Sequence, residues 1–201
     1  MSKKVICEYA YPVEHAFLST SINLTEMNEY LFKISKKVVK TSDGLGLRCV
    51  YIDVDCAEKK RSVQKDFEEL TQVLEGLVTW LRLARHIDVD SRPIMAGSIL
   101  FESDLLAAIE ESQPLASQLE LIAKKLKRAQ KSIESKTKLS SVLGYLVNEG
   151  YLLNKAGTGS IYQATAKWSL LYDQLEFLAK AEGMLDVEEE ASGVSQQMEI
   201  F

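Results

Sequence analysis

The stretch LSSVLGYLVNEGYLLNKAGTGSIYQAT (residues 139–165) decides the fold. Its first part has apolar residues at helical spacing: Leu139, Val142, Leu143 and Leu146. Gly150 predicts the end of this helix, because glycine is the residue that most often follows a helix C-terminus. YLLN and SIYQAT are typical of short strands, and KAGTG between them is a turn in which Gly157 and Gly159 can take positive φ. We therefore expect a helix followed by two antiparallel strands.

This order of helix, strand, glycine-rich turn and strand is that of a winged-helix domain. Helices predicted at Val63–Arg85 and Asp104–Glu111 would complete its three-helix core. A further helix is predicted at Leu115–Ile133, with Pro114 in its first turn, and it is additional to a minimal winged helix. The predicted fold class is α+β, mainly α, with winged-helix architecture.

The chain before residue 60 predicts a smaller arrangement of the same kind. Val5–Tyr11 (VICEYAY) is typical of a short strand. Asn23–Lys40 (NLTEMNEYLFKISKKVVK) predicts a helix capped by Asn23, with Glu26 at the capping-box position. Leu47–Asp55 (LRCVYIDVD) predicts a strand that forms the second arm of a hairpin or wing.

Three ranges follow from these segments. Residues 1–58 are expected to form a small N-terminal α/β domain, a reduced winged-helix-like unit. Residues 59–183 are expected to form a winged-helix domain with a long opening helix, and AKWSLLYDQLEFLAKA as its last helix. Residues 184–201 are expected to form a disordered acidic tail, because EEEASGVSQ is acidic and rich in small residues.

An apolar stripe runs along the longest predicted helix with spacings of four and three. Its residues are Val63, Phe67, Leu70, Leu74, Leu77, Leu81 and Ala84. Two interpretations are open. The stripe can belong to a central core helix, or its residues from Val63 to Leu81 can also bind a partner subunit.

From Leu24 to Leu178 the chain resembles the MukE/MksE group, the kleisin-associated (KITE-type) tandem winged-helix subunits of SMC-type complexes. At the place where a first winged helix would finish, this chain has INLTEMNEYLFKISKKVV and GLRCVYIDVD. FEELTQVLEGLVTWLRL is similar to the long helix that opens the second, and residues 139–165 to its second helix and wing. The resemblance implies a kleisin, an SMC-like ATPase or both as partners, and it allows a homodimer.

The last five residues, QMEIF, resemble the peptide Gln-Leu-(Ser/Asp)-Leu-Phe with which bacterial proteins bind the DNA polymerase sliding clamp. Gln197 matches the glutamine, Met198 replaces the first leucine, and Glu199 occupies the small or acidic position. Ile200 and Phe201 match the final apolar pair. The resemblance implies docking in an apolar cleft of the clamp. The alternative is that the tail folds back on its own domain, since burial of each large apolar side chain is worth roughly 1.5–3 kcal/mol.

Basic residues gather near the predicted helix 139–150. They are Lys124, Lys125, Lys127, Arg128, Lys131, Lys136 and Lys138, with Lys155 in the predicted wing. Two interpretations are open: a solvated helix face, or contact with the phosphates of double-stranded DNA. No set of Arg, Asn and Gln for base readout stands out, so any binding is expected to be weakly sequence-specific.

Other features limit the chemistry. The 201-residue chain has a net charge of −5, which argues against nucleic acid as its sole partner. Three cysteines without a CxxC pair indicate reduced thiols in a cytoplasmic protein, and we expect no signal peptide and no membrane span.

The IDVD segments at 52–55 and 87–90 are interpreted as solvated rather than cation-binding. KAGTGS lacks the GK[ST] of a phosphate loop, and no nucleophile–base pair is evident, so we expect no metal, no cofactor and no enzymatic activity.

The sequence thus favours a non-catalytic DNA-maintenance adaptor in the nucleoid. It would be a subunit of an SMC-like or replication-associated complex, in chromosome maintenance or in defence against plasmids and phage, docked to the sliding clamp. The alternative is a winged-helix transcriptional regulator.

Overall fold

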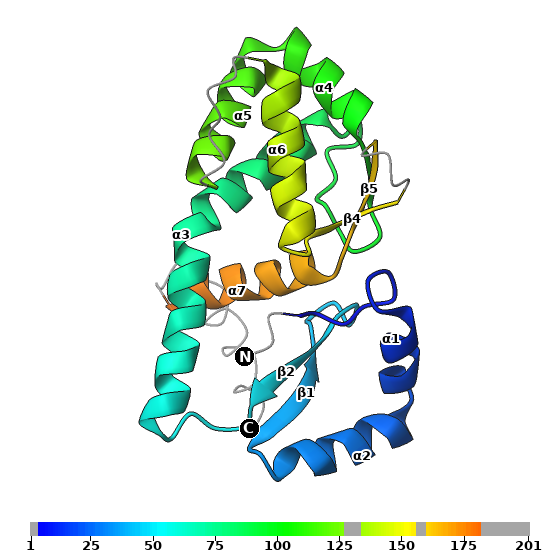
Figure 1. Cartoon of the computed structure of the whole chain (residues 1–201), viewed down its shortest axis with the longest axis vertical. Helices are drawn as coiled ribbons and strands as arrows, with labels where there is room; N and C mark the ends of the chain where they lie inside the picture. Colours follow the sequence, from blue (N-terminus) through cyan, green and yellow to red (C-terminus); the bar gives the residue numbers. More distant parts are fainter. Residues whose placement is uncertain (1–3, 127–133, 156–159, 182–201) are drawn as a thin grey trace, which may run out of the picture.

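The structure, a computed structural model, describes residues 4–126, 134–155 and 160–181. Two parts lie one above the other, and helix α7 crosses between them (Figure 1). We call residues 4–56 the N-terminal unit and the described residues from 57 onward the C-terminal unit. The predicted boundary between residues 58 and 59 falls in the first turn of the helix that begins at Ala57.

The N-terminal unit contains two helices and a hairpin: α1 (Pro12–Ser19), α2 (Ser21–Phe32), β1 (Lys36–Lys40) and β2 (Leu47–Tyr51). The strands are antiparallel, with Lys36 opposite Tyr51. An isolated antiparallel bridge joins Ile6 to Leu47, so a third extended segment borders β2.

Two predictions for this unit are wrong in part. The helix predicted for Asn23–Lys40 begins earlier and ends at Phe32, because Ser35 takes a positive φ of 53° and the β-branched pair in KKVVK enters the hairpin. Asn23 does not cap it, since its side-chain amide donates to the Phe17 carbonyl instead. The strand predicted for Val5–Tyr11 is reduced to the single bridge at Ile6.

The C-terminal unit opens with a long helix and returns to the N-terminal unit through its last one. Its elements are α3 (Ala57–Ile87), β3 (Ile99–Phe101), α4 (Glu102–Glu111), α5 (Gln113–Lys125), α6 (Ser135–Asn148), β4 (Leu152–Asn154), β5 (Ile161–Ala164) and α7 (Lys167–Ala181). Pro114 lies in the first turn of α5 as predicted. The helix predicted up to Ile133 is shorter, because α5 ends at Lys125 and Leu126 lies in a turn. Residues 127–133 lie outside the described residues, as does the predicted turn at 156–159.

Gly150 ends α6 as predicted. It has a φ of +78°, and the N–H groups of Gly150 and Tyr151 donate to the carbonyls of Val147 and Leu146 at 2.9 and 2.8 Å. A left-handed glycine with these two bonds closes a helix C-terminus and satisfies carbonyls that would otherwise lack donors. The chain then turns directly into β4.

The described residues therefore form a mainly helical structure with small antiparallel sheets, which confirms the predicted class, α+β and mainly α. The second sheet has the order β3-β5-β4, and its strand β3 was not predicted. The same order recurs in the N-terminal unit, where the segment at Ile6 borders β2 and β2 pairs with β1. In both units the first extended segment borders the last strand. Within the described ranges, no helix combines the length and apolar character needed to cross a membrane.

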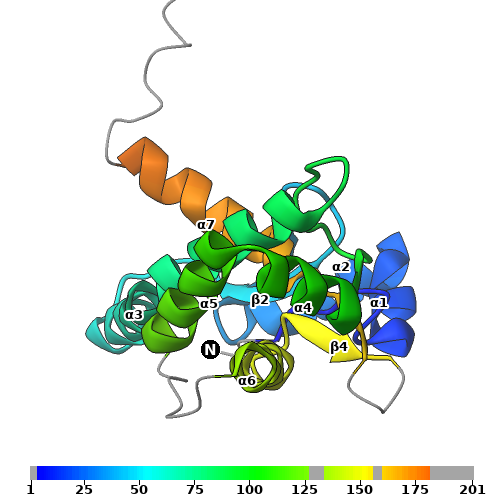
Figure 2. The same cartoon turned by 90° about the horizontal axis from the view of Figure 1, so that it is seen from above.

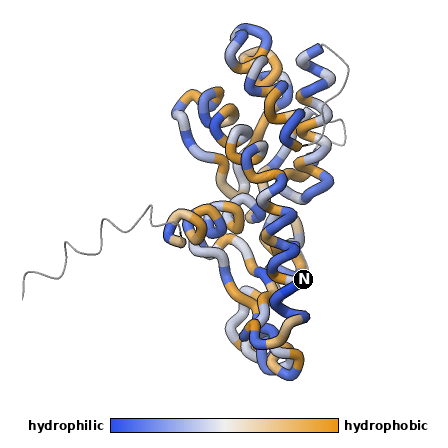
Figure 3. Tube along the Cα trace, turned by 90° about the vertical axis from the view of Figure 1, so that its left-hand side faces the viewer, coloured by the Kyte–Doolittle hydropathy of each residue, from blue (hydrophilic) through white to orange (hydrophobic). Residues whose placement is uncertain are grey.

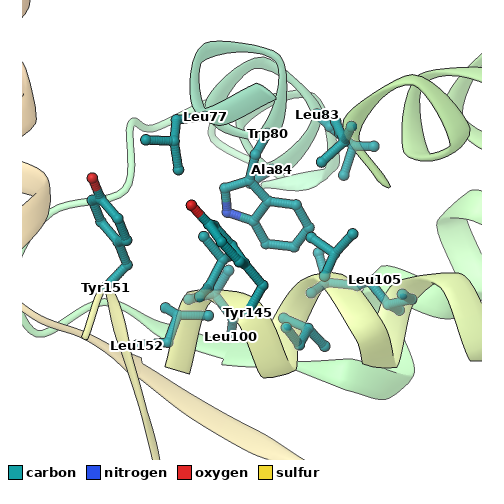
Figure 4. Close-up of a cluster of buried hydrophobic side chains, with 14 of the residues drawn as sticks. Leu77, Trp80, Leu83, Ala84, Leu100, Leu105, Tyr145, Tyr151 and Leu152 are labelled. Carbon is teal, nitrogen blue, oxygen red and sulfur yellow. The ribbon is translucent and has the colours of Figure 1, made fainter. Parts of the chain in front are cut away.

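The main core lies where α3, α5 and α6 meet. Leu77, Trp80 and Leu83 of α3 are fully buried, and Figure 4 shows α3 side chains pointing toward α6. Gly76 permits the close approach of α5, because a Cβ at this position would lie 2.8 Å from Leu126 Cδ2. The C-terminal half of the apolar stripe is thus core, as one of its two interpretations predicts.

We expect Leu77→Ala to lower the free energy of unfolding by about 2–5 kcal/mol, because it leaves a cavity in a closely packed interior. Leu121→Ala is the matched control, since Leu121 lies on α5 and its side chain is 39% exposed. Chemical denaturation monitored by circular dichroism measures both. Equal, small losses for the two variants would contradict the assignment of α3 to the core.

Candidate functional site

A partly enclosed cavity of about 620 Å³ lies between the two units. Its walls come from β2, the N-terminal half of α3, the end of α6 with the turn that follows it, and α7. In Figure 1 these elements surround the region where α7 crosses between the units. Both units therefore contribute side chains to the same concave surface.

Much of the wall is apolar. Side chains from three elements, β2, α3 and α7, contribute: Val50, Val63, Phe67, Leu70, Leu170 and Phe177. The rings of Phe67 on α3 and Phe177 on α7 have centroids 6.1 Å apart and are tilted by 44°, a favourable aromatic geometry. Phe177 is nevertheless 59% exposed, so this pair forms an edge of the cavity rather than part of a closed core.

The polar part of the wall contains one buried donor that lacks an acceptor. Among the described residues, the Nε–H of Arg48 is buried without a hydrogen-bond partner. By contrast, Lys167 donates to the Glu149 carbonyl, and its ammonium lies 4.4 Å from the centre of the Tyr151 ring. A buried donor without an acceptor is costly, so Arg48 favours a ligand that carries an acceptor, above all a carboxylate.

Tyr151 stays neutral in this wall. Burial raises the pKa of its phenol, and the neighbouring Tyr145 and Glu149 raise it further. Its ring lies 4.6 Å from the ring of Trp168, which is fully buried. The phenol therefore contributes surface, but no charge, near neutral pH.

The cavity exists because the N-terminal unit is attached to α7 at one side. Val5, Cys7 and Ala166 form a second, small buried cluster between the units. Gly46 is needed there, because a Cβ would lie 2.8 Å from Val5 Cγ1 and 3.0 Å from Ala166 Cβ. The Ser42 backbone N–H also donates to both carboxylate oxygens of Asp173 at 3.3 Å.

The predicted partner stripe divides between core and cavity. Val63, Phe67 and Leu70 line the cavity, Leu77 is fully buried, and Leu74 and Leu81 pack half-buried against the core. Three of the six predicted positions thus lie where a ligand can reach them. The sequence could not separate the two groups, because one continuous periodicity serves both halves of α3.

The predicted basic cluster is divided too. Lys125 forms an ion pair with Glu75, and Lys138 with Glu120 at 3.3 Å. Lys124, Lys136 and Lys155 are exposed and have no ion pair within the described residues. Lys127, Arg128 and Lys131 lie outside the described residues, as do all five positions of QMEIF, Gln197, Met198, Glu199, Ile200 and Phe201.

Sequence reasoning missed a second basic group. Lys33, Lys36, Lys37 and Lys40 lie at the start of the hairpin of the N-terminal unit. Lys36 lies over the Tyr51 ring at 5.4 Å, and the other three have no ion pair among the residues that the structure describes. The lysines are visible in LFKISKKVVK, but the apolar spacing of that segment predicts a helix rather than a hairpin.

Both IDVD segments form ion pairs with basic side chains. Asp53 and Asp55 contact Lys59 at 2.6 and 3.1 Å, while Asp88 and Asp90 contact Arg92 at 3.5 and 3.1 Å. Neither segment lies in a strand, because β2 ends at Tyr51 and the second IDVD begins at Ile87, the last residue of α3. Throughout the described ranges, no group of three His, Cys, Asp or Glu side chains could hold a metal ion.

Comparison with protein-family models, with curated proteins and with solved structures finds no match to this chain.

Proposed function

We propose that this chain is a non-catalytic DNA-maintenance adaptor, a subunit of an SMC-like or replication-associated complex in the nucleoid. One observation carries the proposal: the N-terminal unit leaves much of its apolar surface exposed. Contiguous exposed apolar surface in a folded protein marks sites of protein–protein contact.

The helices of the N-terminal unit are largely uncovered. Leu18 is the one buried residue of α1, and α2 has none. The exposed large apolar side chains of these helices and the turn after them are Val13 (77%), Phe17 (49%), Ile22 (67%), Tyr30 (65%), Phe32 (69%) and Ile34 (54%). Figure 3 shows the corresponding hydrophobic segments along this part of the trace. If a partner protein covers α1 and α2 in the complex, these exposed apolar side chains become buried, which explains their presence.

The strand order supports a tandem winged-helix architecture for the adaptor. In both units the first extended segment borders the last strand, and two helices precede the hairpin in the N-terminal unit. In the C-terminal unit, α6 leads directly into the β4–β5 pair, which corresponds to a wing. This arrangement agrees with kleisin-associated subunits, and α5 is additional to it.

A second candidate is a winged-helix transcriptional regulator. The observation that favours it is the exposed Lys136 in the first turn of α6, the helix that would enter the major groove. The two candidates differ in sequence specificity, since an adaptor needs phosphate contacts only.

Replacement of Phe17, Tyr30 and Phe32 by Ser should abolish assembly with a second copy or with the kleisin. The melting temperature should not fall, because all three side chains are at least 49% exposed. Val89→Ser is the control, since Val89 is 99% exposed on the C-terminal unit. Size-exclusion chromatography with light scattering, with and without the kleisin and ATPase, measures this. Wild-type protein that remains monomeric in every mixture would contradict the proposal.

Lys124→Glu, Lys136→Glu and Lys155→Glu together should weaken duplex binding evenly across DNA sequences. The slope of log affinity against log salt should shrink by roughly 0.9 for each DNA phosphate that the variant no longer neutralises. Lys65→Glu, an exposed position on α3, is the matched control. Mobility-shift titrations at several salt concentrations measure both quantities. If the variant binds duplex DNA with unchanged affinity, these lysines form a solvated face and do not contact DNA. Tight binding to one defined DNA fragment would favour the transcriptional regulator.

Gln197→Ala with Phe201→Ala should abolish binding to the sliding clamp, because the glutamine and the terminal aromatic are the two ends of the proposed motif. Wild-type affinity should be on the order of micromolar, since short peptides bury little area after ordering costs. Val194→Ala in the same tail is the control. Calorimetric titration of the cognate clamp measures all three proteins. A wild-type chain that releases no heat and binds no clamp in a pull-down would remove the clamp from the proposal.

A further inference from the structure

We propose that the cavity between the two units is a docking site for this chain's own C-terminal segment, Met198–Phe201. The same segment would then have two alternative binding sites, the cavity and the sliding clamp. The cavity proposal does not depend on the clamp, because it is argued from the walls of the cavity and the composition of the segment.

The end of the described chain lies close to the cavity. Phe177 lines it, and Ala181 follows four residues later on the same helix, a rise of about 6 Å. The end of α7 points away from the helices of the C-terminal unit (Figure 2). From Ala181 to Met198 there are seventeen residue steps (198 − 181). A flexible chain of that length has an average end-to-end distance of roughly 20–25 Å, which is enough to turn back to the cavity.

The apolar side chains of the segment match the apolar wall. Met198, Ile200 and Phe201 provide a flexible, a branched and an aromatic side chain. The cavity offers Val63, Phe67 and Leu70 on α3, opposite Leu170 and Phe177 on α7. Its volume of about 620 Å³ lies within the range of roughly 300–1,000 Å³ that is usual for binding pockets.

Charge fixes the orientation. Arg48 has a buried Nε–H without an acceptor among the described residues, and Glu199 is the single charged residue of the segment. The wall also contains four carboxylates, those of Asp66, Glu69, Glu149 and Asp173. Asp173 accepts hydrogen bonds from Ser42, and Lys167 lies beside Glu149, so the attraction for Glu199 comes from Arg48 itself and not from an overall positive wall. A Glu199 carboxylate beside Arg48 would form a charge-assisted hydrogen bond and place the apolar side chains on either side of it.

The tether favours this occupant over a separate peptide. A short flexible linker holds its ligand at an effective concentration near the millimolar range, so even a weak site is filled. The acidic run Glu188–Glu190 lies between α7 and the segment in sequence, and docking of the segment would not require its burial. Binding of the clamp to QMEIF would therefore vacate the cavity and expose Phe67 and its neighbours to another ligand.

Disulfide trapping in the full-length chain tests the proposal. Cys49 lines the cavity and is a free, half-buried thiol, so Ile200→Cys places a second thiol within the docked segment while keeping Met198 and Phe201. Mild oxidation should link residue 200 to Cys49 within one chain, as a disulfide requires Cα atoms within roughly 4–7 Å of each other. Peptide mapping should show this link in preference to one with the exposed Cys56 by at least about fivefold.

Two control variants decide the outcome. Val194→Cys should link to Cys49 at least about fivefold more slowly, and Cys49→Ser should remove the product. Equal linking from positions 194 and 200, or a preference for Cys56, would overturn the proposal. A link between two chains would assign the cavity to a second copy's tail and overturn it as well.

Hydrogen exchange gives an independent measure: Met198→Ser with Phe201→Ser should speed exchange in β2 severalfold and leave α4 unchanged. No change in β2 would overturn it.

Discussion

The architecture depends on one constraint: α3 is longer than the core that holds it. Its 31 residues span about 46 Å, and Leu77, Trp80 and Leu83 anchor only the C-terminal half against α5 and α6. A helix anchored at one end keeps its direction, so the N-terminal half stands clear of the helical core. The N-terminal unit and α7 must then be placed around that free half. The cavity results from this geometry, since neither covers Val63 and Phe67 completely.

The attachment between the units is small compared with the core. Val5, Cys7 and Ala166 provide a few buried contacts, and the Ser42–Asp173 hydrogen bonds are exposed. A segment entering the cavity gains roughly 1.5–3 kcal/mol for each large apolar side chain, and about 1–2 kcal/mol per residue opposes this through ordering of its backbone. These terms nearly cancel for a short peptide. Docking in the proposed site is therefore reversible, and a competing partner can remove the segment.

Local patterns predicted the elements whose signals are local. Gly150, Pro114 and the periodicity of α3 each act within a few residues, and the structure bears them out. The helix predicted through Lys40 is wrong in part, because Val38 continues the helical spacing of Leu31 and Ile34, whereas pairing with β2 places Val38 and Val39 in a strand. Strand β3 has three residues and depends on β5, sixty positions away. The cavity was unpredictable for the same reason, because it requires α7 to return beside the first hairpin.

Two sites that share one ligand are thermodynamically coupled. If the C-terminal segment fills the cavity in the free protein, a ligand that displaces it must raise the affinity of QMEIF for the clamp. By linkage, the clamp must raise the affinity of the cavity for that ligand by the same factor. The factor is larger when the segment binds more tightly in the cavity. Couplings of this kind are commonly about 1–3 kcal/mol, or roughly 5–150-fold. An adaptor built in this way would favour its second partner only after the first is bound, because the segment that binds the clamp is the same segment that occupies the cavity.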